Sequence, residues 1–213
     1  MTTVKAEKKK QYFVGIAGNI GVGKTTLTDI IADSFGWKPY YEQVIDNPYL
    51  SDFYGDMRRW SFNLQVFFLS NRFKTHKEME DSGYSCVQDR TIYEDVEIFA
   101  YNLREMGNMS RRDYKNYCEL FSTMTSYLNK PDLIVYLRAT TDTLLSRISS
   151  RGREFEKSIG AEYLHMLNIA YEHWIDRAKN EQNFLIVETD KINILKDEKK
   201  LQNLLDTIEE YCP

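Results

Sequence analysis

Residues 18–25 read GNIGVGKT, between an apolar, β-branched run at 12–18 and a helical pattern at 24–35. The octapeptide matches the pattern G-x-x-x-x-G-K-[ST], whose fixed positions are here Gly18, Gly23, Lys24 and Thr25. Glycines allow successive backbone N–H groups to turn inward around phosphate oxygens, while the lysine reaches the outer phosphates and the hydroxyl is offered to Mg²⁺. The helix adds the positive end of its dipole. The sequence therefore predicts a strand–loop–helix phosphate site, formed by Gly18, Asn19, Ile20, Gly21, Val22, Gly23, Lys24, Thr25 and Thr26.

Outward from this loop, short apolar runs alternate with helical patterns. Strands are expected at 12–18, 37–44, 85–88, 132–137 and 184–188. Helices are expected at 24–35, 56–80, 92–106, 110–128, 140–152, 161–181 and 196–211. Strands that alternate with helices in this way form a parallel sheet, and the crossover helices cover both of its faces. The expected fold class is α/β, a P-loop NTPase fold with a five-stranded parallel sheet and helices on both faces.

The composition excludes several classes of protein. The 213 residues include 28 Lys and Arg against 32 Asp and Glu, a formal net charge of −4, which argues against a nucleic acid partner. Cys86, Cys118 and Cys212 are widely spaced and odd in number, as is typical of a reducing compartment. No run approaches the ~20 apolar residues that span a bilayer, and residues 1–11 lack the apolar core of a signal peptide. We expect one cytoplasmic domain over 1–213, with a flexible tail at 1–11 and no membrane partner.

The tetrapeptide NKPD at 129–132 fits the guanine-reading NKxD pattern of GTPases. In those proteins the motif follows a strand, whereas here it precedes the strand at 132–137. Ligands in open α/β sheets bind beyond the carboxyl ends of the strands. We therefore interpret NKPD as a turn and a strand start at the opposite edge.

Charged residues follow two of the expected strands. Glu42 lies at the end of one strand, and Asp89 and Arg90 follow another. In a parallel sheet these positions share the edge of the phosphate loop. A kinase that acts on a hydroxyl group needs a carboxylate to accept the proton, and Glu42 is the candidate base. Asp89 is a candidate Mg²⁺ neighbour with Thr25, and Arg90 is placed to offset charge on the transferred phosphoryl group.

A second basic feature is the segment that contains Arg147, Arg151 and Arg153. Arg147 and Arg151 are four residues apart and share a helix face, and Gly152 permits a turn that brings Arg153 round. Three guanidinium groups in such a short segment suit a lid, at about 147–160, that closes on a triphosphate. The alternative is a solvated surface paired with Glu154 and Glu156.

The ordered motifs resemble one family, the deoxyribonucleoside kinases. They are GNIGVGKT, YYEQV, LQVFFLSNRF, QDRTIYEDVEIF and RGREFEKSIGAEYL, and they extend from about residue 12 to 188. The resemblance implies that Glu42 is the general base on the 5′-hydroxyl and that Arg90 lies beside it. It implies that Tyr54 and Glu156 bind the sugar 3′-hydroxyl. The nucleobase would contact Gln65, Arg72, Asp95 and Phe99, and the lid would be formed by Arg147, Arg151 and Arg153.

The resemblance also implies the reaction. A deoxyribonucleoside 5′-hydroxyl would be phosphorylated by ATP with Mg²⁺, and the enzyme would be a homodimer. In such relatives a pair like Arg72 and Asp95 implies deoxyadenosine, deoxyguanosine or deoxycytidine rather than thymidine as the substrate. Of these, we expect the purine deoxynucleosides to be preferred, with deoxycytidine possible. An apolar stripe in the helix at 161–181 either packs on the sheet or forms the dimer contact. Its members are Leu164, Leu167, Tyr171, Trp174 and Ala178.

Two alternatives remain open at this point. A thymidylate-type nucleoside monophosphate kinase would need basic residues for the phosphate of its acceptor, whereas Tyr54 and Glu156 suit a neutral sugar hydroxyl. A regulatory module would bind ATP without an acceptor, and Glu42 would then have no task.

Overall fold

The computed structural model describes residues 10–42, 47–153, 156, 159–190 and 197–213. Its centre is a five-stranded sheet of order β2-β3-β1-β4-β5, in which every pairing is parallel. The strands are β1 (Phe13–Gly18), β2 (Lys38–Tyr40), β3 (Cys86–Asp89), β4 (Leu133–Arg138) and β5 (Phe184–Glu188). The predicted fold class is confirmed. The strand expected at 37–44 is shorter than predicted, and residues 43–46 lie outside the described part.

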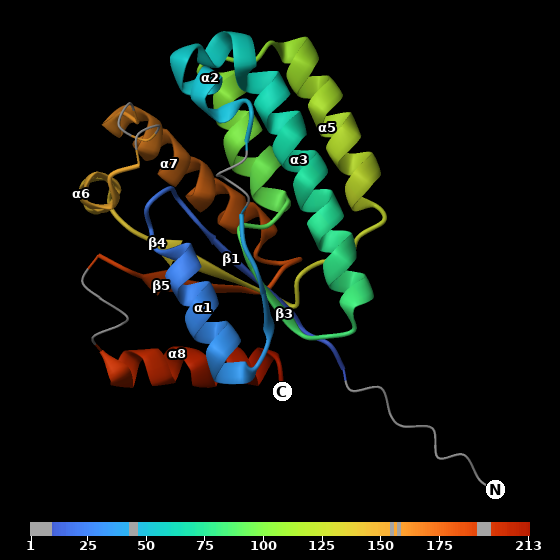
Figure 1. Ribbon diagram of the computed structural model, residues 1–213, viewed down its shortest axis with the longest axis vertical. Coiled ribbons are helices and arrows are strands. Elements are labelled where there is room, and N and C mark those ends of the chain that lie inside the picture. Colours follow the sequence, from blue (N-terminus) through green and yellow to red (C-terminus); the bar gives the residue numbers. More distant parts are fainter. Residues whose placement is uncertain (1–9, 43–46, 154–155, 157–158, 191–196) are drawn as a thin grey trace, which may run out of the picture.

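Helices cover both faces of the sheet, as Figure 1 shows. The helices α1 (Lys24–Phe35) and α8 (Glu198–Tyr211) lie on one face. The other side carries α2 (Leu50–Gly55), α3 (Met57–Ser82), the π-helix η1 (Asp95–Ala100), α4 (Tyr101–Glu105), α5 (Arg111–Thr125), α6 (Thr141–Arg151) and α7 (Ala161–Ala178). Two sequence predictions need correction here. The single α-helix expected at 92–106 contains a π-helical segment, and α2 was not expected as a separate helix.

Local sequence signals begin and end several of these helices. The Ser110 hydroxyl accepts the N–H of Asp113 at 3.0 Å and caps α5. Thr140 caps α6 in the same way, accepting from the N–H of Thr143 at 3.4 Å. Gly152 ends α6 in the left-handed conformation that a glycine adopts without a Cβ clash. The starts of α5 and α6 and the end of α6 agree with the sequence prediction, whereas α5 ends at Thr125, before the expected residue 128.

The apolar stripe of α7 packs on the sheet. Leu164, Leu167, Tyr171 and Trp174 are all buried in the core that surrounds the strands. The Tyr171 ring stacks on Tyr136 of β4 with centroids 5.2 Å apart. Of the two readings of this stripe, packing on the sheet is the one that the structure shows.

The NKPD segment lies at the edge of the sheet opposite the phosphate loop. An oxygen of Asp132 accepts the N–H of Phe13, the first residue of β1, at 2.8 Å. Asn129 donates from its backbone and side chain to Glu80 of α3, at 2.6 and 2.9 Å. The motif therefore joins α3 to the strand starts, as expected for a turn.

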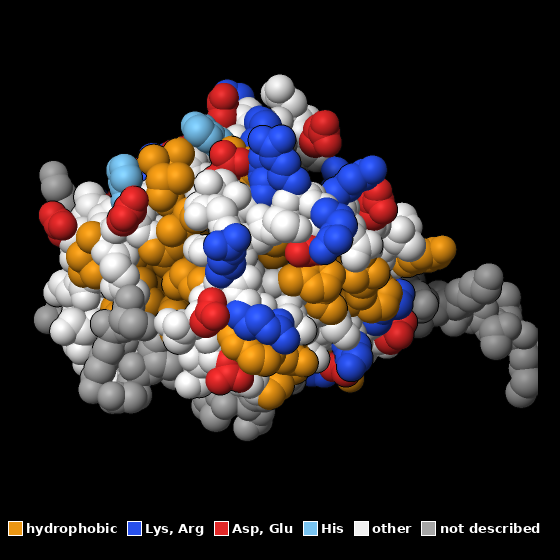
Figure 2. Space-filling model, turned by 90° about the horizontal axis from the view of Figure 1, so that it is seen from above, with side chains coloured by type: hydrophobic (Ala, Val, Ile, Leu, Met, Phe, Trp, Pro, Cys, Tyr) orange, Lys and Arg blue, Asp and Glu red, His pale blue; other side chains and the backbone are white. Residues whose placement is uncertain are grey.

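On the face in Figure 2, acidic side chains are interspersed among the basic ones. Within the described residues, no helix combines the length and the apolar character that crossing a membrane requires.

Candidate active site

The phosphate loop joins β1 to α1 and has the backbone that its glycines predict. Gly18 and Gly21 have φ values of 146° and 82°. A Cβ at Gly18 would lie 2.7 Å from the backbone oxygen of Leu137, so this position has no room for a side chain. The Lys24 ammonium donates to the backbone oxygens of Gly18 and Asn19 at 3.0 and 3.1 Å. Burial and the charge of Arg90 lower the pKa of Lys24 to about 8.

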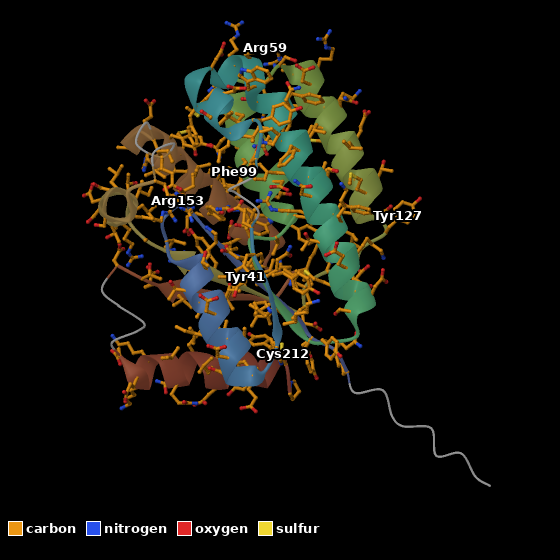
Figure 3. The ribbon with its side chains drawn as sticks, in the orientation of Figure 1. Tyr41, Arg59, Phe99, Tyr127, Arg153 and Cys212 are labelled. Carbon is orange, nitrogen blue, oxygen red and sulfur yellow. The ribbon has the colours of Figure 1, made fainter. Side chains whose placement is uncertain are left out.

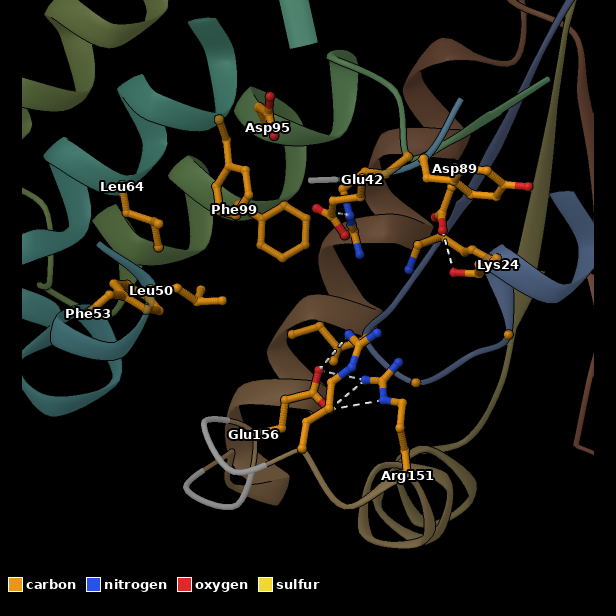
Figure 4. Close-up of a pocket in the computed structure, with 18 of the residues that line it drawn as sticks. Lys24, Glu42, Leu50, Phe53, Leu64, Asp89, Asp95, Phe99, Arg151 and Glu156 are labelled. Carbon is orange, nitrogen blue, oxygen red and sulfur yellow. Dashed lines mark hydrogen bonds and ion pairs between the residues drawn. The ribbon is translucent and has the colours of Figure 1, made fainter. Parts of the chain in front are cut away.

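A cavity of about 440 Å³ opens from this loop toward the helical layer. Figure 4 shows Lys24 and Asp89 on one side of it and Leu50, Phe53, Leu64 and Phe99 on the other. Figure 3 places Phe99 and Arg153 between α6 and α3. The predicted site residues that line the cavity are Ile20, Gly21, Gly23, Lys24, Thr25, Thr26, Glu42, Tyr54, Gln65, Arg72, Asp89, Arg90, Asp95, Phe99, Arg147, Arg151, Arg153 and Glu156. The tertiary structure thus brings together residues from seven different segments of helix, strand and loop.

The carboxylates at the strand ends have different partners. Glu42 forms ion pairs with Arg72 of α3 and with Arg90, whose Nε lies 3.1 Å from Oε1 of Glu42. Burial alone would raise the pKa of Glu42, but Arg90 and Arg72 outweigh burial and lower it to about 2. Asp89 instead accepts the hydroxyl proton of Thr25 at 2.5 Å. Glu42 is therefore held ionised toward the cavity, and Asp89 faces the loop.

Arg90 adopts a backbone conformation that few side chains tolerate. Its φ is 69°, and among the described residues it is the only residue other than glycine with a positive φ. The left-handed conformation costs about 1–2 kcal/mol for a residue with a Cβ, and such strain gathers at functional sites. The turn directs the guanidinium over the Phe99 ring, 4.5 Å from its centroid. Arg90 thus reaches Glu42 although both follow the ends of different strands.

The far end of the cavity combines an apolar surface with a few polar atoms. Arg72 donates to Asp95 and also lies over the Phe68 ring, 4.8 Å from its centroid. Burial raises the pKa of Asp95 to about 6, although the Arg72 charge opposes this effect. Oε1 of Gln65 and Oδ2 of Asp95 are buried and have no partner among the described residues. Two acceptors in an apolar pocket are suited to the donors of a planar ligand.

The lid arginines divide into two groups. Arg151 donates to both oxygens of Glu156, at 2.6–3.0 Å, and Arg153 lies 3.5 Å from the same carboxylate (Figure 4). Arg147 instead donates to Val22 of the phosphate loop at 3.0 Å and to the backbone oxygen of Thr189 at 2.6 Å. Arg147 therefore ties α6 to the loop, which the lid interpretation did not predict. Residues 154, 155, 157 and 158 of the predicted lid lie outside the described part.

Comparison with known proteins identifies the family. The model of the family described as deoxynucleoside kinase matches residues 14–213. The chain belongs to the deoxynucleoside kinase family. A deoxyadenosine/deoxycytidine kinase of Bacillus subtilis is 41% identical over 201 residues, which cover 93% of this chain and 92% of the relative. A deoxyadenosine kinase of Dictyostelium discoideum is 41% identical over 162 residues, 76% of this chain and 66% of the relative.

Solved structures support the same assignment. The structure of deoxyadenosine kinase from M. mycoides with bound dATP has a TM-score of 0.82 and 30% identity, and it covers 92% of this chain and 100% of that one. The same kinase with the products dCMP and dCDP has a TM-score of 0.81. These relatives favour a nucleoside kinase over the monophosphate kinase and the regulatory module.

Some residues of this deoxynucleoside kinase site escaped the sequence interpretation. The missed residues that also line the cavity are Leu50, Phe53, Leu64, Tyr41 and Tyr163. Their apolar spacing resembles that of ordinary core residues, so no local signal separates them from the core. Glu94 is fully buried beside Arg90 and was also missed. The pattern Thr91-x-x-Glu94 is a helix-start signal that could have drawn attention to it.

Proposed function

We propose that this deoxynucleoside kinase transfers the γ-phosphoryl group of ATP to the 5′-hydroxyl of deoxyadenosine, with deoxycytidine as its second substrate. The observation that carries this choice is a pair of buried acceptors, Oε1 of Gln65 and Oδ2 of Asp95, to which no described residue donates. Adenine and cytosine each present an exocyclic amino donor next to a ring nitrogen acceptor. The Gln65 amide can accept from the amino group and donate to the ring nitrogen.

Guanine and thymine present a carbonyl oxygen at the same edge. That oxygen would face the Asp95 carboxylate. Both groups are hydrogen-bond acceptors, so no hydrogen bond could form between them in this buried position. The names of the Bacillus subtilis and Dictyostelium discoideum relatives agree with this preference. We therefore place deoxyguanosine and thymidine below deoxyadenosine and deoxycytidine.

The chain's own residues supply the remaining roles. Lys24 and the loop N–H groups would hold the triphosphate. Arg151 and Arg153 would break their ion pairs with Glu156 and close over the triphosphate. Glu42 would accept the proton of the 5′-hydroxyl, while Arg90 offsets the charge of the phosphoryl group. Tyr54 and the released Glu156 would bind the 3′-hydroxyl. The lid is then coupled to the acceptor, because Glu156 is a partner of both.

The residues also fit a Mg²⁺ ion brought in with ATP. Among the described residues no three acidic, His or Cys side chains are grouped as a complete metal site. Mg²⁺ needs few protein ligands when phosphate oxygens and water supply the others. Thr25 offers a hydroxyl oxygen, and Oδ1 of Asp89 is buried with no partner in the part of the chain that the structure describes. We infer that these two residues hold the ion, directly or through water, where it would neutralise phosphate charge.

We also infer a homodimer in the cytoplasm. Apolar side chains of α3 and α5 are left partly exposed, among them Phe62, Val66, Phe73 and Phe121. The three cysteines are free thiols, as is usual in a reducing compartment. Light scattering should give twice the 25.2 kDa mass of the chain. A mass of one chain at micromolar concentration would contradict the dimer.

The test of the proposed function is ADP release from Mg²⁺-ATP against a panel of acceptors. The panel contains deoxyadenosine, deoxycytidine, deoxyguanosine, thymidine, thymidylate and no acceptor. We expect the highest kcat/KM with deoxyadenosine, followed by deoxycytidine. Higher kcat/KM with deoxyguanosine or thymidine would contradict the assigned base contacts, and turnover with thymidylate alone would contradict the acceptor.

A further inference from the structure

Glu94 is a fully buried carboxylate to which none of the roles above gives a task. It lies one turn after Arg90, in the segment that leads from β3 into η1, and its side chain has no exposed surface. A buried carboxylate is costly unless its oxygens accept several hydrogen bonds. Both oxygens of Glu94 do so, and they serve different parts of the site.

One oxygen supports the turn that contains Arg90. Oε2 accepts the backbone N–H of Thr91 at 2.7 Å and lies 3.3 Å from the Thr91 hydroxyl. This is one half of a capping box, in which the side chain of the third helical residue accepts the N–H of the capping residue. Oε2 alone would give Glu94 a local structural role.

The other oxygen connects the two ends of the active site. Oε1 accepts the N–H of Gly18, the first residue of the phosphate loop, at 3.2 Å, and it lies 3.3 Å from Nη1 of Arg90. It also accepts the hydroxyl proton of Tyr171 at 2.6 Å. Arg90 donates to that same hydroxyl at 3.0 Å. Glu94, Arg90 and Tyr171 therefore form a buried network in which each side chain contacts the other two.

The Gly18 peptide carries the link on to the triphosphate side. Its carbonyl oxygen accepts from the Lys24 ammonium at 3.0 Å and lies 2.9 Å from the Tyr171 hydroxyl. Oε1 of Glu94 therefore contacts Arg90 directly, and it is connected to Lys24 through the Gly18 peptide. These are the cations on the acceptor side and on the ATP side of the cavity.

We propose that Glu94 is a positioning residue that fixes Arg90 relative to the phosphate loop. The Arg90 guanidinium then contacts the phosphoryl group during its transfer from ATP to the acceptor. Glu94 touches neither substrate and acts through Arg90 and Gly18. Its effect should therefore fall on kcat rather than on the binding of either substrate. This inference rests on the phosphoryl transfer proposed above.

The isosteric variant Glu94→Gln tests this role because both oxygens of Glu94 accept from backbone N–H groups that cannot reorient. Each oxygen of Glu94 accepts from a backbone N–H, Gly18 on one side and Thr91 on the other. Neither N–H can turn away, so the amide group of a glutamine faces a donor in either orientation. The side-chain volume is kept, but only one of the two sets of contacts can survive, either those of Gly18, Arg90 and Tyr171 or that of Thr91.

The experiment compares Glu94→Gln with Asn102→Ala at a temperature at which both variants are folded. Asn102 is also fully buried and donates to the backbone oxygen of Ile98 at 2.7 Å, but it does not line the cavity. We expect kcat for deoxyadenosine to fall by about 10–100-fold in Glu94→Gln, with the KM values for ATP and deoxyadenosine little changed. Asn102→Ala should lower Tm and leave kcat near that of the unaltered enzyme.

Two further measurements keep the proposal testable, namely Tyr171→Phe if Glu94→Gln folds poorly and a crystal structure of Glu94→Gln if the assay is silent. Tyr171→Phe keeps the carboxylate and removes one member of the set, so we expect a smaller loss of kcat. The double variant should then lose less than the two single effects added together. In a crystal structure of Glu94→Gln, the Arg90 guanidinium should have moved away from Glu42, which does not depend on turnover.

The proposal would be overturned if Glu94→Gln lowered Tm as Asn102→Ala does while keeping kcat. It would equally be overturned by additive effects of Glu94→Gln and Tyr171→Phe, or by an unmoved Arg90 in the variant crystal. Absence of ADP release by the unaltered enzyme would contradict the proposed function instead, and the crystal structure would still decide the role of Glu94.

Discussion

Glu42 is held ionised by two arginines before any substrate arrives. Arg72 and Arg90 lower the pKa of its carboxyl to about 2, so the group is a carboxylate throughout the neutral range. A base of such low pKa accepts a proton only as the transfer nears completion. As the proposed base, Glu42 would then contribute in the ground state by orienting the hydroxyl. One of its arginine partners, Arg72, also contacts Asp95 and so links Glu42 to the end of the cavity that is proposed to hold the nucleobase.

The first prediction concerns this carboxylate. Glu42→Gln should lower kcat by about 10²–10⁴-fold, because the hydroxyl loses its proton acceptor. Steady-state kinetics with deoxyadenosine measure the effect. Glu97→Gln is the matched control, since Glu97 pairs with Arg177 at 2.5 Å and does not line the cavity. Near-normal turnover of Glu42→Gln would rule out Glu42 as the base.

The second prediction concerns pH. Burial raises the pKa of Asp95 to about 6, so its carboxyl gains a proton as the pH falls through this value. A protonated Asp95 no longer offers a full acceptor to the amino group of the base. We expect kcat/KM for deoxyadenosine to decrease below about pH 6, with kcat at saturation affected less, since kcat/KM reports the free enzyme.

The control for this pH profile is Asp95→Asn. Its kcat/KM should be lower overall, and the limb near pH 6 should be absent. Glu42 cannot produce that limb, because its pKa is about 2. An unchanged limb in Asp95→Asn would assign the titration to another group.

Among the elements, β1 sets the geometry of the phosphate loop that follows it. Gly18 ends β1, pairs with Leu137 of β4, and begins the phosphate loop. Its N–H and carbonyl are both used, by Glu94 and by Lys24. The strand thus positions the loop through its own backbone rather than through side chains.

The third prediction is made for this junction. Gly18→Ala should destabilise the protein by about 1–3 kcal/mol and weaken ATP binding, because the added Cβ would meet the Leu137 backbone oxygen at 2.7 Å. Thermal unfolding and ATP titration measure the two effects. Gly55→Ala is the control, since nothing lies within 4 Å of a Cβ at that position. Unchanged ATP affinity in Gly18→Ala would show that the loop tolerates the shift.

The π-helical segment η1 is a second element that places side chains at the cavity. It begins at Asp95 and includes Phe99, and both side chains line the cavity. A π-bulge adds a residue to the turn and is common at functional sites. Asp95 and Phe99 were expected on one face from an α-helical spacing of four residues. The structure keeps them together although the turn is wider.

On the scale of the whole molecule, the cavity lies between the loop edge of the sheet and the helical layer. Its lining comes from the phosphate loop, the ends of β2 and β3, and the helices α2, α3, η1, α6 and α7. A ligand that occupies both ends would therefore join segments that are far apart in the chain. Binding to the folded state alone raises stability by mass action.

The fourth prediction follows from this arrangement. Mg²⁺-ATP and deoxyadenosine, each at about 100 times its Kd, should each stabilise the fold by about 2.7 kcal/mol and raise Tm. Lys24→Ala should lose the shift due to ATP and keep the shift due to deoxyadenosine, since Lys24 lies at the loop end only. Chelation of Mg²⁺ should reduce the ATP shift alone. A loss of both shifts in Lys24→Ala would contradict two separable ends of one cavity.

Local sequence patterns determined the phosphate loop, the alternation of strands and helices and the parallel sheet, because each of these depends on neighbouring residues. They also placed Glu42, Asp89 and Arg90 at one edge, since parallel strands end together. The resemblance located Gln65, Arg72, Asp95 and Phe99.

Only the tertiary structure decided which of these groups are partners. Arg72 meets Glu42 and Asp95 across 30 and 23 residues of chain, and Glu94 meets Gly18 across 76. Arg147 is tied to Val22 across 125 residues, and the α7 stripe packs on the sheet. Ion pairs and buried hydrogen bonds between distant segments depend on where the packed core places each backbone, and no local pattern carries that information.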